Sequence, residues 1–118
     1  MTIKEFEKLV DKAVEDLPKE FKDRLNNVDF VVEVWPNRAH LQAVKLQRGL
    51  LFGLYQGTPQ TKRGRGTLYP DKITIFAGPI LYVSRNQQDA EKNIARVVRH
   101  EIAHHFGLSE HRIRRAGH

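Results

Sequence analysis

The sequence feature that most constrains the fold is a long helical pattern that runs from Asp89 to about Phe106. Its apolar residues recur at a helical spacing and gather on one side of the helical wheel: Ile94, Ala95, Val98, Ile102 and Phe106. Gly107 follows at the position where a glycine commonly ends a helix in the left-handed conformation. We therefore expect one amphipathic helix here, with its apolar side against the core.

The remaining elements are predicted from shorter patterns. Thr2 and Glu5 form a capping-box pattern, and helical spacing then continues to Leu17. Pro18 ends this helix or starts a short second one. Three segments rich in β-branched and aromatic residues are predicted as strands: Val28–Trp35, Leu50–Tyr55 and Lys72–Ala77.

Three further segments are less clear in pattern. Residues 38–48 fit neither the helical nor the strand period. Gly78 and Pro79 break the third strand, and residues 80–83 extend it or begin a connection. Residues 109–115 are expected to form a short final helix with Ser109 as its N-cap.

Length and composition indicate one globular domain over residues 1–118. The chain has no cysteine, which excludes disulfides and thiolate ligands, so any metal must be held by imidazole and carboxylate groups. Its charged N-terminus does not resemble a signal peptide, and no apolar stretch approaches the roughly 20 residues of a membrane span. We expect a cytoplasmic protein with no membrane partner.

The formal net charge of +6 favours anionic partners such as nucleic acid or acidic peptides. The basic residues are spread over most of the chain, however, which is typical of a solvated surface. The net charge is therefore a weaker indication of function than the pattern of histidines.

The strongest chemical signal is the string His100-Glu101-Ile102-Ala103-His104 within the long helical pattern. Residues four apart lie on the same helix face, so the two imidazoles can reach one zinc ion at about 2.0–2.1 Å. Glu101 lies about 100° around the helix from His100, beside the metal, where it can act as general base on zinc-activated water. The alternative is a helix with chance histidines, but their place beside the apolar side and the following Gly107 argue against it.

Here the sequence resembles a known family. The run from His100 to Gly107 reads His-Glu-x-x-His-x-x-Gly, as in zincin metallopeptidases. The strings at 52–59, 71–76 and Gly78-Pro79 are similar to those of the minimal zincin family of small prokaryotic proteins, and the resemblance spans roughly residues 28–113. The fold class is accordingly α/β (α+β). We expect an N-terminal helix, a short twisted and mostly three-stranded sheet on the active-site helix, and a short C-terminal helix.

The resemblance also implies a chemistry: Zn²⁺ bound by His100 and His104, Glu101 as general base, and peptidase activity on a peptide or protein substrate. It places the third ligand three residues after the glycine, at Glu110. Zincins with a Met-turn have histidine there, so this chain departs from them, and it also has no Met after position 1 to form such a turn. His111 is the alternative third ligand, and it is the better donor by residue type.

Zinc hydrolysis also needs a donor for the oxyanion and a surface for the substrate. The candidates are Tyr55, Tyr69, Tyr82 and Arg63, with Tyr55 and Arg63 favoured. The competing interpretation of Tyr55 is a side chain packed at the sheet edge. His105 points away from the two metal ligands and is expected to be a hydrogen-bonded structural histidine.

Three functions follow from these residues. The first is a zinc metallopeptidase. The second is a metal-dependent ribonuclease or RNA-binding basic protein that contacts phosphates through Lys62, Arg63, Arg65 and the arginines after position 111. The third is a zinc-stabilised domain without turnover, although two histidines and one carboxylate leave a position open, which favours catalysis.

Overall fold

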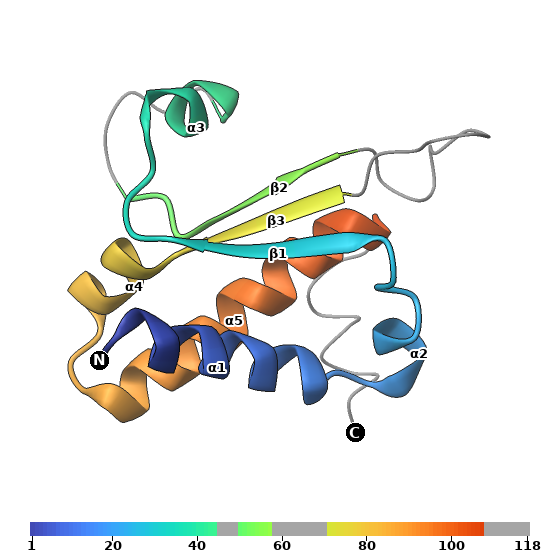
Figure 1. Cartoon of the computed structure of the whole chain (residues 1–118), viewed down its shortest axis with the longest axis horizontal. Helices are drawn as coiled ribbons and strands as arrows, with labels where there is room; N and C mark the ends of the chain where they lie inside the picture. The colour runs from blue at the N-terminus through green and yellow to red at the C-terminus, as the bar shows by residue number, and fades with distance from the viewer. Residues whose placement is uncertain (45–49, 58–70, 108–118) are drawn as a thin grey trace.

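The computed structural model describes residues 1–44, 50–57 and 71–107 of the chain. Within these ranges helices and strands are interspersed along the sequence (Figure 1). In chain order they are α1 (Ile3–Glu15), α2 (Lys19–Lys22), β1 (Val28–Glu33), α3 (Arg38–Ala43), β2 (Gly53–Gln56), β3 (Asp71–Phe76), α4 (Ala77–Val83) and α5 (Gln87–Phe106).

The strands form a three-stranded mixed sheet in the order β1-β3-β2. β3 is central, pairing in parallel with β1 and antiparallel with β2. Lys72 is the one exposed residue of β3, as expected for a strand covered by neighbours. The sheet and its helices confirm the α+β class and the three-stranded sheet that the sequence predicted.

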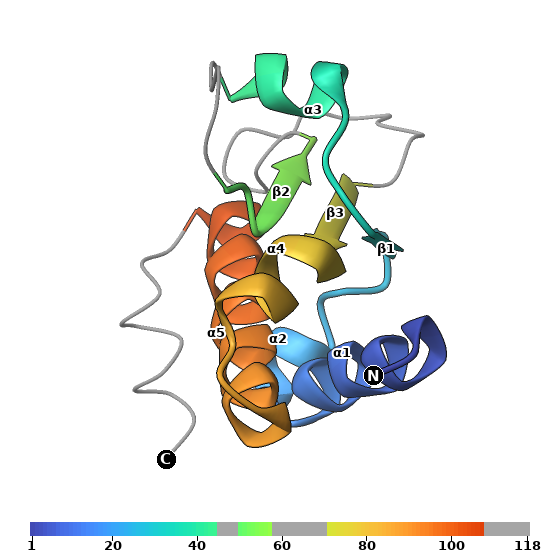
Figure 2. The same ribbon diagram turned by 90° about the vertical axis from the view of Figure 1, so that its left-hand side faces the viewer.

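Helices α1, α2 and α5 lie on one side of the sheet, and α3 lies on the opposite side (Figures 1 and 2). The core between sheet and helices is apolar and draws on several elements. Its fully buried members are Phe6 of α1, Ile73 and Ile75 of β3, Ile80 of α4, and Ile94, Val98 and Ile102 of α5. The predicted apolar side of the long helix therefore does face the core.

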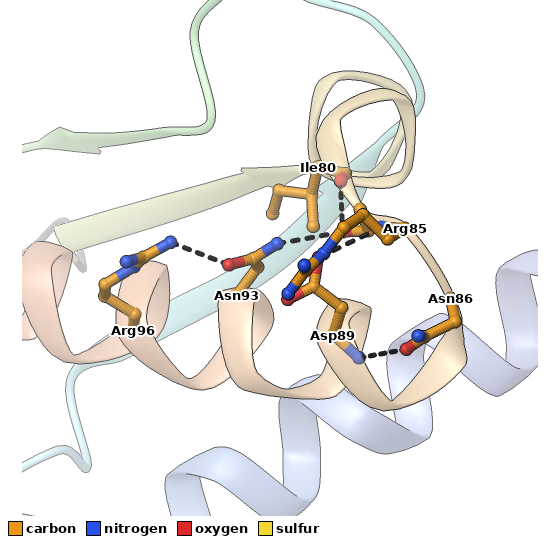
Figure 3. Close-up of polar contacts among 7 residues, drawn as sticks. Ile80, Arg85, Asn86, Asp89, Asn93 and Arg96 are labelled. Atoms are coloured by element: carbon orange, nitrogen blue, oxygen red, sulfur yellow. Dashed lines mark hydrogen bonds and ion pairs between the residues drawn. The ribbon is translucent and has the colours of Figure 1, made fainter.

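Helix α5 is fixed at both ends. The side chain of Asn86 accepts a hydrogen bond from the main-chain N–H of Asp89 at 2.8 Å, which caps the first turn (Figure 3). Asn93 donates to the Ser84 hydroxyl at 2.9 Å, joining the second turn to the end of α4. At the other end Gly107 has φ +66°, the left-handed cap predicted from the sequence.

The segment after β3 differs from the prediction, because residues 77–83 form helix α4 and do not extend the strand. Pro79 is the third residue of this helix, where its missing N–H needs no partner. Gly78 allows the turn to pass close to β1: its N–H donates to the Val34 carbonyl at 2.7 Å, and a Cβ there would lie 2.5 Å from the Trp35 ring.

For two other segments the structure adds to the prediction or corrects it. The ambiguous stretch after residue 38 contains helix α3, which Asn37 caps by accepting from the His40 N–H at 2.9 Å. Strand β2 begins at Gly53, three residues later than expected. The predicted final helix over 109–115 lies outside the described residues. No helix in the described part of the chain is long and apolar enough to cross a membrane.

Candidate metal and catalytic site

The three residues of the histidine motif line one cleft. His100, Glu101 and His104 of α5 line a cavity of about 450 Å³, together with residues of β2 and with Ala43 and Val44 at the end of α3. The two imidazole side chains are each 52% exposed, and their ring centroids lie 4.6 Å apart. The helical spacing therefore brings both rings to the same opening, as the sequence predicted.

Glu101 lies deeper than its neighbours, with only 5% of the residue exposed. Its Oε1 is 3.6 Å from His104 Nδ1, and its Oε2 is 4.0 Å from His100 Nε2. Burial raises the pKa of this carboxyl group above its ordinary value, while nearby His100 and a hydrogen bond from the main chain of Tyr55 partly oppose that rise.

Strand β2 approaches α5 closely at Gly53. A Cβ at this position would lie 2.8 Å from Val97 Cγ1, 3.0 Å from Glu101 Cγ and 3.2 Å from Glu101 Oε2. A glycine is therefore required for the strand to cover the carboxyl group. This role of Gly53 was not predicted, although an isolated glycine inside a strand pattern is a signal of close backbone approach.

The donor set fits a zinc ion in kind and in charge state. Burial, and then the nearby His100, lower the pKa of His104, so its neutral form is favoured near neutral pH. Neutral imidazole is the form that binds zinc. Zinc also binds carboxylates. Because the chain has no cysteine, Asp and Glu side chains are the other common zinc ligands that it contains.

The described part of the chain contains no complete set of metal ligands. Within residues 1–44, 50–57 and 71–107, no group of three His, Asp or Glu side chains is placed to hold a metal ion. Both candidates, Glu110 and His111, lie outside these ranges, as do Arg63, Tyr69 and the basic residues 62–65.

Of the candidate tyrosines, Tyr55 lines the cleft and Tyr82 does not. The Tyr55 hydroxyl donates to Asp71 Oδ2 at 2.7 Å, although the ring still lines the cleft. Tyr82 is 75% exposed on α4 and does not line the cleft. The commitment of the Tyr55 hydroxyl to Asp71 favours a packing role for this side chain over donation to an oxyanion.

His105 is buried, with 1% of the residue exposed, and its Nδ1 lies 2.6 Å from Asp71 Oδ2. This confirms the prediction of a hydrogen-bonded structural histidine. The role of Asp71 was not predicted from the sequence, where this residue only begins the string at 71–76. The signal that could have identified it is a carboxylate at the head of an otherwise apolar strand, because buried charges require specific partners.

A second cavity of about 330 Å³ adjoins the cleft and shares Leu51, Gly53, His100 and Glu101 with it. Its other walls are mainly apolar, formed by Leu50, Phe52 and Val97, with Arg96 beside them. The site therefore combines a polar, titratable wall with an apolar recess next to Glu101.

Comparison with known proteins identifies the family of this chain. No curated protein matches the chain. Among solved structures, a conserved hypothetical protein from Thermus thermophilus is similar at 27% sequence identity and a TM-score of 0.60, covering 90% of this chain and 94% of that one. The sequence model of the zincin-like metallopeptidases matches residues 25–118. That match takes in every element from β1 to α5 and the whole histidine motif, and the chain thus belongs to the zincin-like metallopeptidase family.

Proposed function

We propose that this protein is a zinc-dependent peptidase in which Glu101 is the general base. The observation that carries the proposal is the position of the Glu101 carboxylate, buried in the cleft wall between two half-exposed histidines. Membership of the zincin-like metallopeptidase family supports the same class of reaction.

His100 and His104 would hold the zinc ion, with Glu110, or His111 in its place, as the third ligand. When bound, zinc supplies a Lewis acid for the peptide carbonyl and makes water more acidic. The contribution of the chain itself is proton transfer. Glu101 takes a proton from the attacking water and passes it to the nitrogen of the leaving amine. Its raised pKa suits both steps, because the populations of the protonated and ionised forms of Glu101 are then less unequal near neutral pH.

The walls of the cleft suggest how a peptide would lie. β2 is at one edge of the described sheet and contributes its residues to the cleft, so an extended peptide can pair with its main chain. The apolar recess beside Glu101 would then receive an apolar side chain next to the scissile bond. Arg63 stays a candidate for binding the substrate or the oxyanion.

The decisive test replaces Glu101 with Gln. Glu101→Gln keeps the size of the side chain but cannot accept the proton, so peptide turnover should fall by at least about a hundredfold. Zinc content per molecule, measured by metal analysis, should not change. The matched control is Glu91→Gln, which alters a carboxylate on the same helix but outside the cleft and should leave turnover unchanged.

A Glu101→Gln variant that retained full activity would contradict the proposal. The same metal analysis applied to Glu110→Ala and His111→Ala identifies the third ligand, since loss of the true ligand lowers zinc affinity while loss of the other does not.

The RNA-directed alternative depends on basic residues that lie outside the described part of the chain. It is tested by measuring RNA affinity at increasing salt. A steep decline with salt would support phosphate contacts, and absence of binding at low salt would remove this function.

A further inference from the structure

A group of buried polar side chains lies next to the cleft and plays no part in the reaction proposed above. Asp71 begins β3 and is only 2% exposed. One of its oxygens, Oδ2, receives the Tyr55 hydroxyl at 2.7 Å and lies 2.6 Å from His105 Nδ1. The three side chains come from β3, β2 and α5, so this carboxylate joins the central strand to the two elements that carry most of the cleft residues.

Burying a carboxylate is costly unless hydrogen bonds compensate for the lost water. An ionised carboxylate only accepts hydrogen bonds, so both neighbours serve as its donors. The main chain is also shaped around it: Gly57 has φ +152°, and a Cβ at that position would collide with Asp71 Oδ1. The buried carboxylate and the glycine beside it are better explained by a need to place Asp71 at this point than by its contribution to stability alone.

Tyr55 connects this buried group to the reacting side chains. Its main-chain N–H donates to the Glu101 carboxylate. Its ring lies edge-on to His104, with centroids 6.4 Å apart at an interplanar angle of 77°. One residue of β2 therefore contacts the proposed base through its backbone, a proposed zinc ligand through its ring, and Asp71 through its hydroxyl.

We propose that Asp71 is a positioning residue for Glu101, acting through Tyr55. By holding the Tyr55 hydroxyl, Asp71 fixes β2 against the last turns of α5 and keeps the Tyr55 N–H directed at the Glu101 carboxylate. The catalytic consequence of this arrangement rests on the proposed function, whereas the arrangement itself does not. His105 contributes from the helix side by holding Asp71 in place.

The first experiment measures the Tyr55 N–H directly, by ¹⁵N-resolved NMR of the metal-free protein. In Tyr55→Phe and in Asp71→Asn, the amide proton of residue 55 should move upfield and exchange with solvent about tenfold faster, because local opening becomes easier. Glu101→Ala supplies the reference signal for this amide without its acceptor. The matched controls are Tyr82→Phe and Asp29→Asn, which alter an exposed tyrosine and an exposed aspartate.

The second experiment measures peptide hydrolysis by the zinc-loaded variants. Tyr55→Phe and Asp71→Asn should lower kcat by about tenfold, the scale at which outer residues act on metal sites. Zinc affinity should stay within about twofold of the wild type, because the proposed metal ligands are unchanged. The double variant should lose no more than Asp71→Asn alone, since both changes interrupt one connection.

The outcomes separate this inference from the proposed function. If the wild-type protein hydrolyses no peptide, the function fails, yet the amide of residue 55 still decides whether Asp71 positions the strand. Unchanged amide signals in both variants overturn the positioning role. Wild-type kcat despite a shifted amide also overturns it, because the contact then has no effect on Glu101. Should Asp71→Asn fail to fold, Tyr55→Phe decides alone.

Discussion

At the scale of single residues, the site holds a carboxyl group where its charge is unfavourable. Glu101 is nearly enclosed by α5 and β2, and Gly53 is what lets the strand cover it. The cost of this burial appears as a raised pKa. A group used for proton transfer benefits from such a shift, so Glu101, if it has the proposed role, serves the reaction at the expense of the stability of the folded protein.

This trade-off gives a prediction about pH. In the unfolded chain Glu101 titrates near its ordinary value of 4.5, and in the folded protein at a higher value. Between these values the folded state keeps a proton that the unfolded state has lost, so stability falls as pH rises through that window. Metal-free Glu101→Gln lacks this penalty and should be more stable than the wild type above the window, with a smaller difference below it.

The measurement is urea unfolding of both proteins at pH 4 and pH 8, with a chelator present. Glu91→Gln is again the control, because it should show no such pH-dependent gain. An equal stability difference between wild type and Glu101→Gln at both pH values would mean that burial does not penalise the charge of Glu101.

The residues of the site differ in how far the sequence could predict them. His100, Glu101 and His104 follow from one helical period, because a local spacing fixes which side chains share a face. Asp71 and Gly53 could not be placed in this way. Their roles arise where strands meet α5, and those contacts join residues far apart in the chain.

At the scale of elements, α1 carries a task that the family match does not include. The match begins at residue 25, whereas α1 ends at Glu15. Yet Phe6 and Val10 of α1 belong to the same buried cluster as Ile94 and Val98 of α5. The N-terminal helix thus packs against α5 and supports it without lining the cleft.

We therefore expect Phe6→Ala to separate stability from activity. Phe6 is fully buried, so its truncation should lower the free energy of unfolding by about 3–5 kcal/mol. Turnover per folded, zinc-loaded molecule should stay at the wild-type level, because the cleft residues are untouched. Denaturant unfolding and peptide hydrolysis at low temperature give the two numbers.

The control for that variant is Ile3→Ala, which truncates a side chain of the same helix that is 42% exposed and should cost less than about 1 kcal/mol. A large loss of turnover in folded Phe6→Ala would show that α1 also sets the geometry of the site.

Elements with a clear period were predicted well, and those set by long-range packing were not. α1 and α5 have caps and apolar spacing that act locally, so their positions follow from the sequence. α4 was missed because Gly78 and Pro79 resemble a break. What makes them part of a helix is the close passage against Val34 and Trp35 of the segment after β1.

At the scale of the whole molecule, the apolar core and the proposed zinc site are separate. The core cluster draws on α1, α2, β3, α4 and α5, whereas His100 and His104 project into the cleft on the exposed flank of α5. A fold with such a core does not depend on the metal in the way that a small zinc-held domain does. The arrangement thus favours a catalytic zinc over a purely structural one.

Metal removal tests this separation. After chelation, the protein should keep its helical circular dichroism and a cooperative thermal transition, because the core remains intact. Added zinc should raise Tm in a concentration-dependent manner, with a gain of about 4 kcal/mol at a thousandfold excess over Kd. His100→Ala should melt like the chelated wild type and respond weakly to zinc. If chelation instead abolished the helical signal, the metal would be holding the fold together, and the third function, a zinc-stabilised domain without turnover, would become the better explanation.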